Sequence, residues 1–209
     1  MPFWPKKRIK TVNQDLLLKL GTELEEKSSR SEGTGHVFIH PDNARLIFKR
    51  EHVKELLGAL SWYDEDYRTV LWQNMCLIMC ILVSMRWPEW DQFRDLFFFP
   101  GEGLKSPRYT DSDLPIKKEA FPEKASVTFL KQFHEHQYRF VPITIKEGSH
   151  LEYSTDRRLP VLKREPLRDA EGAQGIVEKV FIEKNFLYYA NDASNHSVSH
   201  LSLVDWIIN

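Results

Sequence analysis

The stretch from Arg158 to Val180 reads RLPVLKREPLRDAEGAQGIVEKV, and the interpretation of the whole chain depends on it. Its centre, residues 170–177 (AEGAQGIV), fits the spacing G-x-G-x-x-G-x-V with alanine in place of the first glycine. Apolar residues alternate before it (159–167) and after it (177–182), which predicts two strands joined by a glycine-bearing turn. The layout is that of a hairpin whose turn lies over nucleotide phosphates, and a hairpin without a ligand is the alternative.

Four residues are candidates for that contact. Gly172 and Gly175 occupy the second and third glycine positions, where a missing Cβ lets backbone amides approach phosphate oxygens. Ala170 occupies the first glycine position, and the β-branched Val177 is expected to cover the face of an adenine ring. We therefore name these four as the predicted cofactor-binding residues.

The charge balance argues against two classes of partner. The 209 residues carry 30 acids and 29 bases, a formal net charge of −1, so no bulk attraction to nucleic acid or to an anionic membrane is expected. The longest apolar run, Met75 to Val83, is shorter than the roughly 20 residues that a bilayer span needs. It contains Cys76 and Cys80, which lie on one face of the expected helix and therefore cannot easily form a disulfide. Two buried thiols without a disulfide framework are typical of a protein in a reducing compartment. Without a secretory signal in residues 1–10, the prediction is a cytoplasmic or nuclear protein.

Helical periodicity dominates the first part of the chain. Leucines at helical spacing predict a helix over 13–27, capped by Asn13, and the longest helix is expected over 64–85. The apolar run Phe97 to Pro100 is expected to pack under the helices, because four such residues in a row would be costly in water. Further helical patterns cover 41–48, 52–60, 89–96 and 123–136.

The pattern then changes twice. Residues 101–122 contain several prolines and glycines and read as a long connector on the surface. From Tyr138 to Ile145 the period becomes two, which predicts a strand, and Pro142 makes it an edge strand or a bulged one. We predict an α+β chain: a helical domain with a small β element over 1–155, and a small antiparallel β element over 156–209.

Histidine pairs do not predict a metal site. His134 and His136 are out of phase for one helix face, whereas His196 and His200 have helical spacing in a loop-like context. Neither pair has a third ligand placed by the sequence, so no metal is predicted. The basic residues of Arg157-Arg158 and Lys163-Arg164 are expected to lie at a solvated strand edge.

The segment from about Phe121 to Trp206 resembles the region that leads into the catalytic domain of a group of fungal protein-kinase-like proteins. Outside the altered glycine loop, the resemblance rests on short stretches of sequence, namely 137–143 (QYRFVPI), 147–150 (EGSH), 157–160 (RRLP) and 180–186 (VFIEKNF). The helical part before Phe121 also resembles the helical region upstream of those kinases. The resemblance implies that the C-terminal β element corresponds to the first strands of a kinase N-lobe.

The chain departs from such kinases where their third strand supplies a lysine for the α- and β-phosphates. The corresponding segment is 200–206 (HLSLVDW), with Val204 at the lysine position, and no lysine follows Lys184. Neither a His-Arg-Asp catalytic loop nor an Asp-Phe-Gly metal site occurs. Because phosphoryl transfer depends almost entirely on positioning and charge stabilisation, the resemblance implies a protein without catalytic residues of its own.

Two functions follow from this resemblance. The first is a kinase-related, catalytically incomplete binding or regulatory module, a pseudokinase fragment with a protein partner, whose ATP binding is weak or lost. The alternative is the N-terminal regulatory and ATP-binding fragment of an active fungal Ser/Thr protein kinase.

Overall fold

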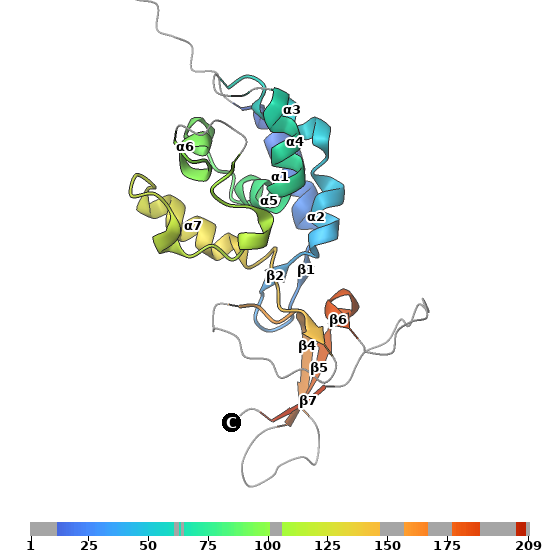
Figure 1. Ribbon diagram of the computed structural model, residues 1–209. Helices are drawn as coiled ribbons and strands as arrows, with labels where there is room; N and C mark the ends of the chain where they lie inside the picture. The colour runs from blue at the N-terminus through green and yellow to red at the C-terminus, as the bar shows by residue number, and fades with distance from the viewer. Residues whose placement is uncertain are drawn as a thin grey trace, which may run out of the picture. The chain divides into compact units, whose positions relative to one another are not determined.

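The computed structural model describes residues 12–60, 63, 65–100, 106–146, 157–166, 177–188 and 204–207 (Figure 1). The fold is α+β and mainly helical, as predicted. The chain forms two compact units: residues 1–26 with 42–137, and residues 27–41 with 138–209. The sequence predicts a single boundary at residue 155, whereas the second unit begins its C-terminal part at residue 138 and also takes in the segment 27–41.

The first unit is helical. Its first helix, α1, begins as predicted, because the backbone N–H of Leu16 donates to Oδ1 of Asn13 at 3.1 Å and so satisfies one donor of the first turn. The leucine stripe of α1 is buried, and α1 packs against α5. The α-helices are α1 (Gln14–Glu26), α2 (Pro41–Ile47), α3 (Arg50–Leu57), α4 (Glu65–Asn74), α5 (Cys76–Ser84), α6 (Phe93–Phe97) and α7 (Val127–Gln137). Short 3-10 turns lie at Trp90–Gln92, Asp111–Asp113 and Lys118–Ala120.

The single long helix predicted over 64–85 is wrong. The chain breaks at Met75 into α4 and α5, which are bent by 89°. The cause lies far away in the sequence: Oδ1 of Asp111 accepts hydrogen bonds from the backbone N–H groups of Leu77 and Ile78 at 2.9 and 3.1 Å. A carboxylate at this position satisfies the free donors of a new helix N-terminus and complements its dipole.

Helix α5 forms the centre of the helical unit, and its residues from Cys76 to Val83 are all buried. Both cysteines are free, and their thiols donate to the backbone carbonyl oxygens of Phe48 and Ala44, each at 3.7 Å. Burial raises the pKa of the Cys80 thiol well above its ordinary value, with neighbouring Cys76 adding to the shift. Within the described residues no single helix is long and apolar enough to cross a membrane.

An aromatic cluster joins α6, α7 and the chain between them. The ring of Phe97 stacks on Phe93 at 4.9 Å between centroids and meets Phe121 and Phe133 at 5.8 and 5.9 Å. Phe97 and Phe98 are buried as predicted, but Phe99 is 43% exposed, so the expectation that the whole run packs under the helices is wrong at this residue. Helix α6 ends at Phe97 and Phe98 continues in an extended conformation, so neighbouring side chains leave on opposite sides.

The predicted surface connector contributes to the core in its described part, 106–122. Tyr109, Ile116 and Phe121 are buried. The fully buried amide of Gln137 binds the backbone of Ile116 in both directions: Oε1 accepts from its N–H at 2.7 Å and Nε2 donates to its carbonyl at 3.0 Å. This pairing satisfies buried polar groups on both partners and fastens the connector to the end of α7.

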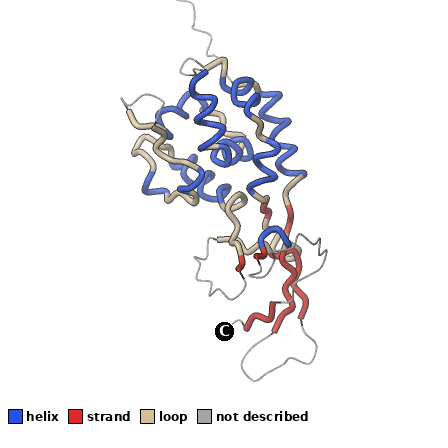
Figure 2. Tube along the Cα trace, turned by 45° about the vertical axis from the view of Figure 1, so that its right-hand side comes forward, coloured by secondary structure: helices blue, strands red, loops and turns tan. Residues whose placement is uncertain are grey.

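The second unit is built from short strands (Figure 2). Most of the strand predicted from Tyr138 to Ile145 is absent: residues 138–140 form turns, and only its last residue belongs to β3. Tyr138, Phe140 and Ile143 are nonetheless buried. The apolar alternation therefore indicated correctly which residues are buried, but not that they pair in a β-sheet. The strands are β1 (Ser29–Arg30), β2 (Val37–Phe38), β3 (Ile145–Lys146), β4 (Val161–Pro166), β5 (Val177–Ile182), β6 (Leu187–Tyr188) and β7 (Val204–Ile207). They pair as β1-β2, β3-β6 and β4-β5-β7.

Candidate functional site

The candidate site is the ribbon formed by β4 and β5, whose two strands are those predicted on either side of the glycine motif. They pair antiparallel from Val161 opposite Ile182 to Pro166 opposite Glu178, with a bulge between Val161 and Lys163. The last pair of the ladder therefore brackets the motif at 170–176, which connects the two strands. A bulge increases local twist, which curls a two-stranded ribbon.

A third strand joins the ribbon along β5. Strand β7 pairs antiparallel with β5, with Val177 opposite Ile207 and Val180 opposite Val204. The spatial order is β4-β5-β7, so β5 lies in the middle and receives hydrogen bonds along both edges. The sequence segment predicted as a third strand, 200–206, overlaps β7 at its last three residues.

A small aliphatic core holds one side of the ribbon. Val161, Val180 and Ile182 are buried together with Ile143 and Ile145 from the chain before β4. Leu159 and Leu187 pack against the same cluster. The alternation of β5, with buried Val180 and Ile182 on either side of half-buried Phe181, follows from the two-residue period of a strand.

The opposite positions of the ribbon carry charge. Nζ of Lys163 lies 2.9 Å from a carboxylate oxygen of Glu165, and this hydrogen bond raises the pKa of Lys163 and lowers that of Glu165. The ammonium groups of Lys179 and Lys163 lie 4.8 and 6.0 Å from the ring centroid of Phe181. The side chains of Lys163 and Glu165 are exposed, so their ion pair contributes little to stability.

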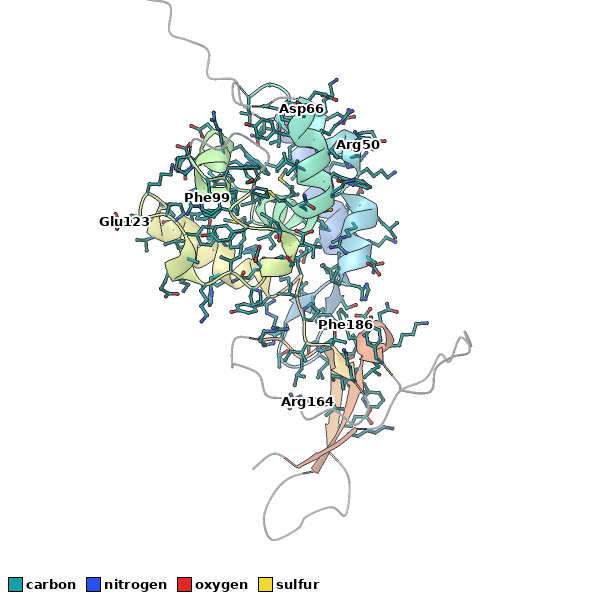
Figure 3. The ribbon with its side chains drawn as sticks, in the orientation of Figure 1. Arg50, Asp66, Phe99, Glu123, Arg164 and Phe186 are labelled. Atoms are coloured by element: carbon teal, nitrogen blue, oxygen red, sulfur yellow. The ribbon has the colours of Figure 1, made fainter. Side chains whose placement is uncertain are left out.

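The segment 27–41 supports the ribbon from a distant part of the sequence. The guanidinium of Arg158 donates to the carbonyl oxygen of Val37 at 2.8 Å, and the backbone N–H of Glu32 donates to the carbonyl of Leu162 at 2.7 Å. The buried ring of Phe186, which follows β5 closely, meets Phe38 edge-on at 5.9 Å (Figure 3). Sequence reasoning missed this support, because contacts between residues so far apart leave no periodic signal.

The predicted cofactor-binding residues fall at the edge of what the structure describes. Ala170, Gly172 and Gly175 lie outside the described residues, and Val177 is the first residue of β5. The basic residues predicted at a solvated strand edge have separate roles. Arg158 binds a carbonyl oxygen, and Lys163 pairs with Glu165.

The register of β7 bears on the lysine position. Val204 pairs with Val180, which is an odd number of residues from Val177 along β5. Residues an odd number apart occupy opposite faces of a ladder, so the positions on the face of Val177 are those of Asp205 and Ile207. Neither is a lysine, and no position of the described β7 is a lysine.

The described residues contain no group of three or more histidine, cysteine, aspartate or glutamate side chains that could hold a metal ion. His134 and His136 belong to α7, where the ring of His136 shares a hydrogen bond with Ser84 at 3.0 Å. His196 and His200 lie outside the described residues. Comparison of the whole chain with family models, curated proteins and solved structures finds no match.

Proposed function

We propose that this chain is a kinase-related protein that acts through binding rather than through catalysis. In this proposal the β4-β5 ribbon is the remnant of a phosphate-binding hairpin, and β7 corresponds to the third strand. The helical unit is a regulatory or docking part. The proposal rests on one observation: the altered glycine motif connects two antiparallel strands, and a third strand pairs antiparallel with the second of them.

The order of the strands supports this kinship. A glycine-rich turn can cradle phosphates only if it joins two adjacent antiparallel strands, and the pairing of Pro166 with Glu178 provides that context. The segment that the resemblance assigns to the third strand overlaps β7, which pairs with β5 and not with β4.

The chemistry supports binding rather than phosphoryl transfer. The described β7 has no lysine to hold the α- and β-phosphates, and the 209 residues contain no His-Arg-Asp or Asp-Phe-Gly triplet. Each of these groups positions or neutralises phosphate charge in the transition state, so their joint loss removes most of the rate acceleration. ATP, if held at all, would be held weakly by the turn and by Val177.

A protein is the partner class that the ribbon favours. Among the described strands, β7 pairs only with β5, and no described strand pairs with its other edge. An open edge of this kind can accept an extended segment of another chain as an additional strand.

Thermal unfolding in the presence of millimolar ATP and Mg²⁺ tests the role of the turn, because a ligand that binds the native state raises the melting temperature. The wild-type chain is expected to show little or no rise. Ala170→Gly completes the glycine spacing and is expected to produce a rise, whereas Gly175→Val in that background is expected to remove it. Ala173→Val, at a position where the spacing does not require glycine, is the matched control and is expected to leave the rise intact.

Three results would change the proposal. A rise with the wild-type chain that Gly175→Val abolishes would favour the alternative, an ATP-binding regulatory fragment of an active Ser/Thr kinase. No rise with Ala170→Gly would remove the support for a phosphate-binding turn. Transfer of radiolabelled phosphate from ATP to a generic substrate by the purified chain would contradict the proposal of a non-catalytic protein.

A further inference from the structure

A hollow in the helical unit has a chemistry of its own. Its volume is about 410 Å³. Its lining comes from α6, from the residues that directly follow α6, and from the chain between α6 and α7. That volume is in the range of pockets that hold a small molecule or a few side chains of a peptide. It is lined by Arg94, Asp95, Phe98, Phe99, Pro100, Arg108, Pro122 and Lys124.

The lining is positively charged. Among the described residues it contains three cations, Arg94, Arg108 and Lys124, and one acid, Asp95. Within that part of the chain Asp95 pairs only with Lys124, at 3.1 Å between Nζ and the carboxylate oxygen, so this acid leaves Arg94 and Arg108 without a paired carboxylate there. Both partners of this pair are more than half exposed, so a ligand carboxylate can replace Asp95 at small cost.

An aromatic ring stands beside the cations. Phe99 is 43% exposed, whereas its neighbours Phe97 and Phe98 are buried, and its side chain can be located in Figure 3. The guanidinium carbon of Arg108 lies 4.6 Å from the centroid of the Phe99 ring. Stacking of this kind orients the guanidinium, which also forms a hydrogen bond with the side chain of Tyr109.

Arg108 has unused hydrogen-bonding capacity. Its backbone is fixed, since its N–H donates to the carbonyl of Phe97 at 2.7 Å. Its side-chain Nε is buried and has no hydrogen-bond partner among the described residues. The remaining N–H groups of the guanidinium can donate to a carboxylate in the hollow.

We infer that this hollow is a docking site for an acidic segment of a partner protein, in which a carboxylate meets Arg94 and Arg108 and an adjacent apolar side chain packs on Phe99. The charge of the lining selects the carboxylate, and the exposed ring with Pro100 and Pro122 selects the apolar neighbour. This inference concerns the helical unit and does not rest on the kinship of the β ribbon with kinases.

A nucleic acid fits this surface less well than a peptide. Asp95 is one of the lining residues, and Glu123 directly precedes the lining residue Lys124 in the sequence, so two acids lie close to the cations. A continuous polyanion would meet these acids as well as the cations, whereas a short acidic segment can place one or two carboxylates among the cations alone.

Selection from a random dodecapeptide library displayed on phage, with the intact chain as bait, tests the inference. Enrichment of peptides in which aspartate or glutamate neighbours an aromatic or aliphatic residue is the expected result. A labelled peptide of the enriched sequence is then titrated by fluorescence anisotropy against the wild type and variants, and its affinity is expected to fall as salt rises. Enriched peptides without aspartate or glutamate would overturn the inference.

The variants remove one interaction each. Arg94→Gln and Arg108→Gln are each expected to weaken peptide binding by at least about tenfold, and Phe99→Ser by about fivefold to tenfold. Lys19→Gln is the matched control: it removes one positive charge from an exposed side chain on α1 and is expected to leave the affinity unchanged. Arg94 and Phe99 are exposed, so their variants test the site even if Arg108→Gln unfolds the protein.

Two further outcomes would overturn the inference. One is equal affinity of the enriched peptide for the wild type and for both Arg94→Gln and Phe99→Ser. The other is displacement of the peptide by a single-stranded oligonucleotide at lower concentration than by the unlabelled peptide, which would assign the hollow to nucleic acid. The ATP titration of the ribbon reports on a different unit, so either proposal can fail without the other.

Discussion

Phe97 and Phe99 are two residues apart and lie in opposite environments. Phe97 is fully buried among five aromatic rings, whereas Phe99 is 43% exposed. Phe97→Ala is therefore expected to lower the free energy of unfolding by about 3–5 kcal/mol, because it removes buried apolar surface and leaves a cavity. Phe99→Ala is the matched control and is expected to change it by less than about 0.5 kcal/mol. Urea unfolding followed by far-UV circular dichroism measures both, and equal losses would contradict this assignment of burial.

The side chain of Asp111 stabilises the N-terminus of α5. It accepts hydrogen bonds from the backbone N–H groups of Leu77 and Ile78, and Arg45 lies 3.5 Å from its other oxygen. Asp111→Ala is expected to cost about 2 kcal/mol, since both N–H groups lose their acceptor at a largely buried helix terminus. Asp111→Asn keeps an acceptor oxygen and is expected to cost less than half as much. Hydrogen exchange at Leu77 and Ile78 should accelerate in the alanine variant only.

The same carboxyl group predicts a pH dependence. Burial raises the pKa of Asp111 above its ordinary value of 3.8, against the opposing effects of the two amides and Arg45. The folded state therefore binds the proton more tightly than the unfolded state. The contribution of Asp111 to stability is largest below pH 3.8 and is lost as the pH rises through the folded pKa.

The measurement is the difference in unfolding free energy between the wild type and Asp111→Asn, taken at steps from neutral to acidic pH. Acidification is expected to shift this difference in favour of the wild type, because the asparagine variant has no proton to take up at this position. Other titrating groups are common to both proteins and cancel. A difference that is constant, or that shifts toward the variant on acidification, would show that the pKa is not raised.

At the scale of elements, the sequence predicted a helix or strand correctly where the residues that stabilise it are close to it in the chain. The cap of α1 was predicted because Asn13 immediately precedes the leucine stripe of the helix that it caps. The strands of the β4-β5 ribbon were predicted because their apolar alternation coincides with real burial of Val180 and Ile182. In both cases the information and the structure that it specifies lie within a few residues of each other.

The break between α4 and α5 had no comparable signal. The residues from Met75 to Val83 are apolar, and those before Met75 are also compatible with one continuous helix, so periodicity alone favours an unbroken element. The acceptor that stabilises the second N-terminus is Asp111, in a segment read as a connector. The apolar alternation from Tyr138 predicted a strand that is mostly absent, since buried residues at a period of two can also belong to turns.

At the scale of the whole molecule, the two units differ in how much apolar surface each buries. The helical unit surrounds α5 and the aromatic cluster, whereas the ribbon rests on a cluster of five buried aliphatic residues. A small core offsets less of the conformational entropy lost on folding. The second unit is therefore expected to open locally at lower free energy than the first.

Native-state hydrogen exchange measures this difference directly. Amides in the β4-β5 ladder are expected to be less protected than those of α5. Val180→Ala, in the small core, is expected to lower protection in β4 and β5 and to leave α5 unchanged. Equal protection in the two units, or a loss in α5 caused by Val180→Ala, would show that the chain opens as one cooperative unit.

Composition and periodicity were sufficient for the α+β class, for the N-terminal helix with its cap, and for the two strands around the altered glycine motif. Those features depend on interactions between residues close in sequence, which a pattern records. The bend at Met75, the recruitment of 27–41 into the second unit, the burial of the connector and the charged hollow beside Phe99 depend on groups that are distant in sequence. Such groups meet only when the chain is packed, so the folded arrangement alone specifies which polar atoms are paired and which cations line the hollow.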